Sequence, residues 1–288
     1  TQKKKMKIIL LFFFLIVENW ESKYFTPEKV YQFAEYLYKE GDYVRAATEF
    51  QRYLLFFDFL PSYTDSIYYK IGMCYRLAGN FQKAIYYFSK IIKEYPKSFY
   101  FYKAYYQIAL SYFLWGKYDE SLQFINSYLF FINQDEIKLK TNHLIALNYI
   151  YQKKWIKAYN FLNIINMNDS LTLLLTQFAK EGKNLPRKNK FLAGLFSTVV
   201  PGTGKIYCER VWDGFFSLIT IGITGYQAYK GFRQNGSHSL KGWILGTISV
   251  VLYLGNIYGS IVSAEIYNLK KEEEVLNKVR IFINVNHP

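Results

Sequence analysis

Residues 77–81 read Leu-Ala-Gly-Asn-Phe, and this stretch decides the fold because the chain repeats its pattern. Similar stretches are Lys-Glu-Gly-Asp-Tyr at 39–43, Leu-Trp-Gly-Lys-Tyr at 114–118 and Tyr-Gln-Lys-Lys-Trp at 151–155. Their third residues are 38, 37 and 37 positions apart, and they are Gly41, Gly79, Gly116 and Lys153. A constant period of this length predicts an array of similar structural units.

Each copy continues with a small residue and, four positions later, a bulky apolar residue. The small residues are Ala46, Ala84, Ser121 and Ala158, and the bulky ones are Phe50, Phe88, Ile125 and Leu162. A turn glycine permits the left-handed backbone that ends a helix. The small residue lets a second helix lie close to the first, and the bulky one fills the space toward the next unit. The pattern therefore predicts helix–turn–helix repeats.

The pattern resembles the tetratricopeptide repeat (TPR), a helix–turn–helix unit of about 34 residues. The second copy matches the family positions best, with Gly72, Tyr75, Gly79, Ala84, Phe88 and Pro96. The resemblance covers about residues 27–165. It implies a solenoid of about four repeats whose concave face receives a peptide or helix of a partner protein. We expect this solenoid to span residues 24–182, with a capping helix at 170–180 ended by Gly182.

Three departures from the family pattern stand out. The period exceeds the family norm by three or four residues, so the second helix or the loop after it is longer. The third and fourth copies lack the proline, and the fourth has Lys153 where the turn glycine belongs.

Tyrosine is unusually abundant, with 29 copies in 288 residues. Aromatic residues at helical spacing mostly form a core. Adjacent tyrosines cannot all be buried, and an exposed tyrosine is a good protein-contact residue. On the first helices of the repeats, the candidate partner-binding residues are Tyr31, Tyr38, Tyr68 and Tyr105.

The ends of the chain carry most of its excess positive charge. The formal net charge is +14, and ten of these charges lie in residues 1–20 and 183–288, beside the most apolar segments. This distribution favours cations that flank a membrane and disfavours nucleic-acid binding.

Residues 1–20 predict a signal peptide or an N-terminal anchor. Lysines precede the apolar run 8–17, whose ten residues rise about 15 Å as a helix, too short to cross a bilayer. That length is typical of a secretory signal. A buried helix of the repeat domain is the alternative. No small-residue cleavage site follows, and no cysteine follows that could carry a lipid.

Beyond the repeats, residues 183–210 predict a linker with an interfacial or re-entrant segment at 191–204. Residues 211–268 predict a transmembrane helical hairpin, built from the uncharged stretches 214–229 and 242–264. The loop 230–241 would join the two spans. Residues 269–288 predict a charged tail, in which the alternation at 280–286 suggests a short strand.

Two sets of residues in this region are candidate structural sites. The turn motif Pro201, Gly202, Gly204 and Tyr207 is followed by Asp213-Gly214, and it resembles small two-helix membrane domains fused to bacterial TPR proteins of unknown function. It is not a phosphate-binding loop, because Val199 and Ile206 stand where that loop needs Gly and Ser or Thr. The expected helix-packing residues in the membrane are Gly242, Gly246, Gly255, Asn256 and Gly259.

The expected function is a membrane-anchored TPR scaffold or adaptor that binds a protein at the bacterial cell envelope. The alternative is an assembly factor for membrane proteins in which the hairpin acts directly. We predict no catalytic residues, no metal site and no cofactor. The expected partners are a protein on the concave face, the lipid bilayer and a second copy of the chain through the small-residue faces. The predicted location is the inner membrane, with the repeats on the periplasmic side. Whether 191–204 also spans decides the topology.

Overall fold

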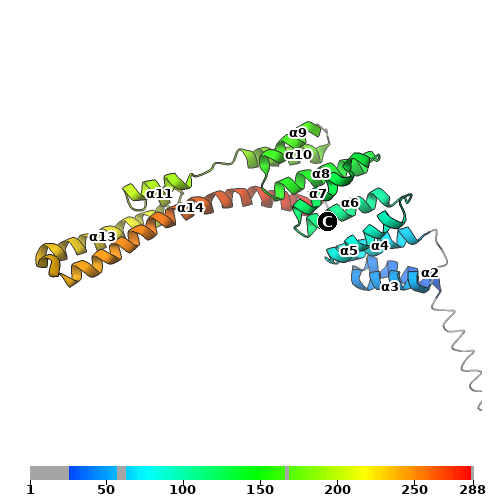
Figure 1. The fold of residues 1–288 in the computed structure, drawn as a ribbon, viewed down its shortest axis with the longest axis horizontal. Coiled ribbons are helices and arrows are strands. Elements are labelled where there is room, and N and C mark those ends of the chain that lie inside the picture. Colours follow the sequence, from blue (N-terminus) through cyan, green and yellow to red (C-terminus); the bar gives the residue numbers. More distant parts are fainter. Residues whose placement is uncertain (1–25, 57–62, 166–168, 287–288) are drawn as a thin grey trace, which may run out of the picture. The chain divides into compact units, whose positions relative to one another are not determined.

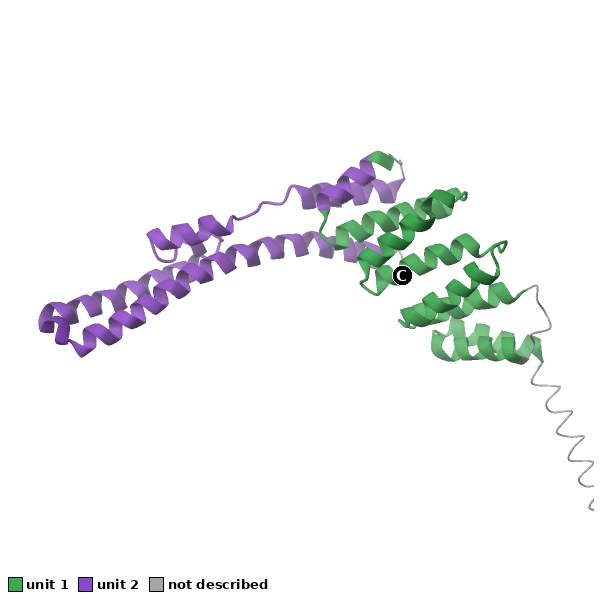
Figure 2. Ribbon diagram, in the orientation of Figure 1, with its two compact units in different colours: residues 1–154, 164–167 green, residues 155–163, 168–288 purple. Residues whose placement is uncertain are grey.

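The computed structural model describes residues 26–56, 63–165 and 169–286. These residues form helices joined by short turns (Figure 1), and no strand occurs within these ranges, so the predicted all-α fold is confirmed. The predicted signal segment 1–20 lies outside the described residues. The chain divides into two compact units, residues 1–154 with 164–167 and residues 155–163 with 168–288 (Figure 2).

The first unit is a TPR-like stack of helix pairs. The helices, in chain order, are α2 (Pro27–Lys39), α3 (Tyr43–Phe56), α4 (Thr64–Leu77), α5 (Phe81–Glu94), α6 (Phe101–Leu114), α7 (Tyr118–Tyr128), the short 3₁₀ helix η2 (Leu129–Phe131) and α8 (Asp135–Tyr151). Each α-helix packs on the next one along the chain, and α6 also contacts α8 (Figure 1). Local signals start these helices: the Thr26 side chain accepts a hydrogen bond from the Lys29 amide, and Pro27 occupies the first turn of α2.

The turns within the pairs have one common geometry. The backbone φ angles at the third residue of each repeated stretch are +82° at Gly41, +75° at Gly79, +78° at Gly116 and +57° at Lys153. In every copy the next residue donates its N–H to a carbonyl five residues back, for example from Asn80 to Tyr75 at 2.8 Å and from Lys154 to Tyr149 at 2.8 Å. This is the helix-ending bond that a left-handed residue permits. Lys153 adopts the same conformation without being a glycine.

The core confirms the predicted roles of the small and bulky positions. Ala46, Ala84 and Ser121 are fully buried, and so are Phe50, Phe88 and Ile125. The buried hydroxyl of Ser121 donates to the Ala109 carbonyl at 2.9 Å and accepts from the Asn148 side chain at 3.1 Å. Ser121, the polar small residue of the third repeat, thus has hydrogen-bond partners for its hydroxyl inside the core.

The second unit contains a helical hairpin. Its helices are α9 (Trp155–Ile165, of which residues 155–163 belong to this unit), α10 (Ser170–Lys183), α11 (Lys190–Val199), α12 (Thr203–Tyr207), α13 (Val211–Asn235), the 3₁₀ helix η3 (Gly236–His238) and α14 (Leu240–Asn286). Helices α13 and α14 pack along one another, and α11 and α12 lie against them (Figure 1).

Three sequence expectations in this unit are wrong. The predicted strand at 280–286 is the end of α14, in which Val275 and Val279 are buried at helical spacing. The loop predicted at 230–241 is shorter, because α13 continues to Asn235. Gly182 does not end the capping helix. It lies within α10, where the Trp155 ring packs against its bare Cα, and Asn184 caps the helix instead.

Candidate functional site

The first helices of the repeats carry a tyrosine at one equivalent position. Tyr31, Tyr69 and Tyr106 each precede a turn glycine by ten residues, and all three are partly buried. Neighbouring repeats are linked along this line: Lys70 lies 5.4 Å from the centre of the Tyr31 ring, and Gln107 donates to the Tyr69 hydroxyl at 3.3 Å. We use the name A-helix row for these residues of the first helices together with Glu35, Tyr38 and Arg76 on the same helices. Its members are Tyr31, Glu35, Tyr38, Tyr69, Lys70, Arg76, Tyr106 and Gln107.

Arg76 is the cation of the A-helix row that has no acidic partner among the described residues. Its side chain is half-buried on α4, and its Nε is buried without a hydrogen-bond partner. Its one hydrogen bond among the described residues goes from Nη2 to the Met73 sulfur at 3.8 Å, and no carboxylate within these ranges pairs with it. Burial lowers the pKa of the Arg76 guanidinium, and the nearby tyrosines, Tyr69 and Tyr106 among them, offset part of this effect.

The other cation of the row is already paired. Lys70 forms an ion pair with Glu35 of the preceding repeat at 2.5 Å and also lies over the rings of Tyr31 and Phe50. Burial acts to lower the pKa of Lys70, but its bonds to Glu35 and Tyr31 outweigh that effect and raise it. Lys70 therefore links α2 to α4, whereas Arg76 has no acidic partner among the described residues.

The tyrosines predicted as partner-binding residues divide into two groups. Tyr31 and Tyr38 belong to the A-helix row, and the Tyr31 ring also packs on Phe50 of α3, with ring centres 5.7 Å apart. Tyr68 packs against Tyr87 and Tyr95, with ring centres 6.2 and 6.1 Å away. Tyr105 stacks near Tyr128 at 4.6 Å. These two side chains therefore pack on aromatic residues of the second helices and at their ends.

Tyr69, Arg76 and Tyr106 are not among the partner-binding residues predicted from the sequence. The repeat register could have found the two tyrosines, because both share the position of Tyr31 relative to the turn glycine. Arg76 shares the position of Tyr38, three residues before the glycine. The first and third repeats have an aromatic residue at this position, so a cation in the second repeat is the signal that could have identified Arg76.

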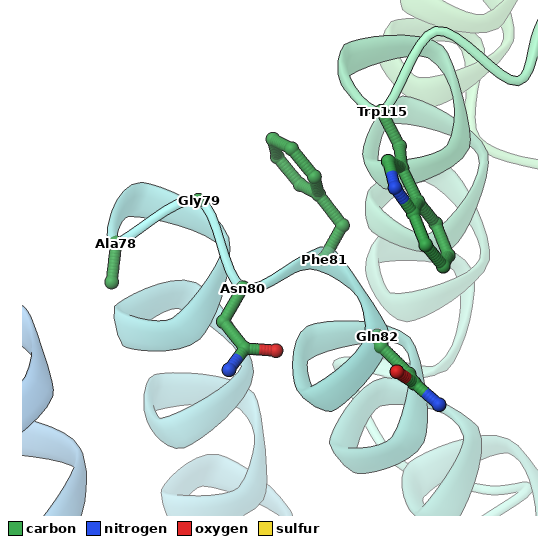
Figure 3. A pocket seen from close by; sticks show the side chains of 6 residues that line it. All are labelled: Ala78, Gly79, Asn80, Phe81, Gln82 and Trp115. Carbon is green, nitrogen blue, oxygen red and sulfur yellow. The ribbon is translucent and has the colours of Figure 1, made fainter.

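A hollow of about 290 Å³ lies at the turns of the second and third repeats (Figure 3). Its lining is Ala78, Gly79, Asn80, Phe81, Gln82 and Trp115. The Asn80 side chain accepts a bond from the Lys83 amide at 3.2 Å, so it caps α5. Lys117 lies 3.8 Å from the Trp115 ring centre. These residues cap helices and pack aromatics, and none of the six lining side chains carries a charge.

The predicted turn motif makes a very close backbone contact. Gly202 has φ +89°, and a β-carbon on it would overlap the Gly214 carbonyl. A β-carbon on Gly214 would lie 2.6 Å from the Gly202 oxygen. Gly204 is similarly pressed against the Ala193 carbonyl, and its N–H donates to Ser197 Oγ at 3.0 Å. These glycines therefore let α11, α12 and α13 meet backbone to backbone.

The remaining motif residues support the same junction. Pro201 follows the last residues of α11, where a proline prevents the helix from continuing. The Tyr207 hydroxyl accepts a hydrogen bond from the Asn189 amide at 3.2 Å, and its ring lies 5.4 Å from that of Phe196. Ser197 and Ser260 share a hydrogen bond of 2.7 Å that connects α11 to α14.

The predicted helix-packing residues of α14 have different surroundings. A β-carbon on Gly242 would come 2.8 Å from the Phe232 ring, whereas one on Gly246 would make ordinary contacts with α13 at 3.8 Å. Gly255 faces open space, and Gly259 lies beside the Lys205 side chain. Asn256 is 3% exposed, and both of its amide atoms are buried without a hydrogen-bond partner.

Among the described residues, α14 is the one helix long and apolar enough to cross a membrane. Its uncharged stretch 242–264 rises about 35 Å, against about 30 Å for the hydrocarbon core of a bilayer. Only 11% of its most apolar window is buried within the protein. Large apolar side chains are accordingly exposed on α14, such as Val251 at 63%, and on α13, such as Phe216 at 73%.

Residues 67–98, which comprise most of α4 and all of α5, match the sequence profile of the tetratricopeptide repeat. A comparison with curated proteins found no match. The match and the stacked helix pairs support a TPR protein, a class whose repeats serve as scaffolds for protein–protein interaction. Within the described ranges, no group of three or more His, Cys, Asp or Glu side chains is placed to hold a metal ion.

Proposed function

We propose that this chain is a membrane-attached scaffold that binds a partner protein through its A-helix row. The repeats provide the fold of an interaction scaffold. The apolar stretch of α14 supplies a means of attachment, since it has the length of a span and leaves its side chains exposed. The partner and the attachment are expectations that the experiments below test.

The observation that carries the proposal is the unpaired Arg76. A half-buried guanidinium whose Nε has no acceptor is costly unless a ligand completes it. The tyrosines around it supply apolar surface and hydroxyl groups. A planar guanidinium binds a carboxylate in two parallel hydrogen bonds. We therefore expect the partner to present an acidic side chain or a C-terminal carboxylate, flanked by apolar residues.

The test of partner binding compares Arg76→Gln with Lys93→Gln in the full chain purified from its native membranes. Lys93 is an exposed cation on α5 of the same repeat, and so serves as the matched control. We expect Arg76→Gln to lose the co-purifying partner and Lys93→Gln to retain it. Equal recovery with both variants would contradict the assignment of Arg76.

The test of attachment is flotation of the full chain with neutral phosphatidylcholine vesicles. The proposal predicts that the chain floats with the vesicles and resists extraction by alkaline carbonate. The expected orientation places the repeats in the periplasm, and a protease added outside spheroplasts should then cleave them. If the chain stays at the bottom of the gradient, membrane attachment is wrong.

A further inference from the structure

A cavity of about 410 Å³ opens between α13 and α14 in the second unit. One end is polar, with Lys205 of α12, Ser217 of α13 and Asn256 of α14. The rest is apolar and includes Phe216 and Val251, whose side chains are 73% and 63% exposed. The cavity therefore joins a hydrogen-bonding end to an apolar surface.

The polar end of the cavity contains hydrogen-bonding atoms that have no partner. Asn256 is 3% exposed, yet neither its amide nitrogen nor its amide oxygen has a partner. Buried amide groups are nearly always hydrogen-bonded in folded proteins. An amide that lines a cavity without a partner therefore points to a ligand or to water in that cavity.

Lys205 supplies a positive charge at the same end. Its ammonium donates to Ser217 Oγ at 2.7 Å. It forms no ion pair with any described carboxylate, and the neighbouring Asp213 is bound to Arg210 at 2.6 Å. The Lys205 stem lies beside Gly259, where a β-carbon would be 3.5 Å from its Cε. Such a distance is an ordinary contact, so the Lys205 side chain packs beside α14 at the edge of the cavity.

We propose that this cavity binds an anionic phospholipid, with the lipid phosphate at Lys205, an ester carbonyl of the same lipid at the Asn256 amide and an acyl chain along the apolar walls. The Lys205 ammonium provides the charge that a phosphate requires. The Asn256 amide lies one turn further into the stretch 242–264 than Gly259, the neighbour of Lys205, and can donate to an ester carbonyl below the phosphate. The exposed apolar walls match a hydrocarbon chain and not a soluble anion. Gly255 leaves the space between these two parts open, since a β-carbon there would meet nothing within 4 Å. This inference rests on the membrane attachment proposed above.

The experiment measures lipid binding by native mass spectrometry of the detergent-solubilised full chain, with phosphatidylglycerol or phosphatidylcholine added. Wild type should bind phosphatidylglycerol more tightly. Lys205→Met should reduce that binding roughly five- to tenfold, as expected for the loss of one cation at a lipid phosphate. Lys205→Arg should restore it, and Lys230→Met, which removes an exposed cation on α13, should leave it unchanged.

Gly255→Leu tests the cavity itself without touching its polar groups. The new side chain would enter open space, so the hairpin should fold with wild-type circular dichroism while phosphatidylglycerol binding is lost. Equal effects of Lys205→Met and Lys230→Met, or unchanged binding in Gly255→Leu, would overturn the proposal. Displacement of the lipid by inorganic phosphate alone would also overturn it. Flotation with neutral vesicles separates these outcomes from a failure of membrane attachment.

Discussion

Gly72 of α4 lies flat against the ring of Phe88 of α5, so closely that a β-carbon on Gly72 would come 2.6 Å from Phe88 Cε1. Phe88 is fully buried and its ring also packs 5.5 Å from that of Tyr69. The glycine therefore sets how near the two helices of the second repeat approach, and it links the repeat core to a tyrosine of the A-helix row.

Gly72→Ala is expected to lower the free energy of unfolding by about 1–3 kcal/mol, because the added methyl group overpacks a rigid core. In a chain that already carries Phe88→Leu, the further loss of unfolding free energy caused by Gly72→Ala should be smaller, because leucine leaves room for the added methyl group. Thermal unfolding followed by circular dichroism measures both variants. A double variant that loses the full sum of the single effects would contradict direct packing of this pair.

Lys153→Gly is expected to stabilise the chain by about 1 kcal/mol, because Lys153 holds a left-handed backbone that costs an L-residue roughly 1–2 kcal/mol. Gly79→Ala is the reciprocal change, at φ +75° with open space around it, and should destabilise by a similar amount. The same unfolding assay applies. Two variants with the same sign of effect would show that the turn conformation does not control stability.

Arg76→Met is expected to separate stability from binding. The variant removes a half-buried cation that has no acid partner, so the free energy of unfolding should stay unchanged or rise by about 1 kcal/mol. Partner recovery should fall as it does with Arg76→Gln. A large loss of stability would assign Arg76 a structural role instead.

Cys74 is expected to be inert in the folded chain. It is fully buried, and burial raises the pKa of its thiol to about 12 from an ordinary value of 9.0. Maleimide should not label it at neutral pH in a Cys208→Ser background until denaturant is added. Because the raised pKa favours the neutral thiol in the folded state, its contribution to stability is complete below about pH 9 and is lost as the pH rises toward 12. Rapid labelling without denaturant would show that the core of the second repeat opens.

Gly202→Ala is expected to disrupt the junction of α12 and α13, because its β-carbon would overlap the Gly214 carbonyl at a strained φ. Gly222→Ala on α13 is the control, since a β-carbon there meets nothing within 4 Å. Limited proteolysis of membranes containing each variant should show new cleavage near residues 200–214 for Gly202→Ala only. Equal cleavage of both variants would mean that the close contact does not hold the junction.

The repeat architecture could be predicted from the sequence because each repeat uses local rules. Gly41, Gly79 and Gly116 mark turns by their freedom at positive φ, and Ala84 with Phe88 marks the contact within a pair. The end of α14 could not be predicted in this way. The alternation at 280–286 favoured a strand, but the helix continues from the apolar stretch, and Phe282 lies 6.5 Å from Phe178 of α10.

The candidate site was predicted only in part, for a similar reason. A shift of one position along a first helix decides whether a tyrosine packs on the second helix of its own repeat or belongs to the A-helix row. Tyr68 and Tyr69 are adjacent, yet Tyr68 packs on Tyr87 and Tyr95, and Tyr69 accepts a bond from Gln107. Whether Arg76 Nε and the Asn256 amide find a hydrogen-bond partner depends on distant residues, which no local pattern shows.

The most direct test of the scaffold function is photo-crosslinking in intact cells with a diazirine amino acid at position 73, beside Arg76, and at position 86, an exposed site on α5. We predict one membrane-associated adduct from position 73 that disappears when Arg76→Gln is introduced, and no such adduct from position 86. The same adduct from both positions, or an adduct from position 73 that persists in Arg76→Gln, would contradict it.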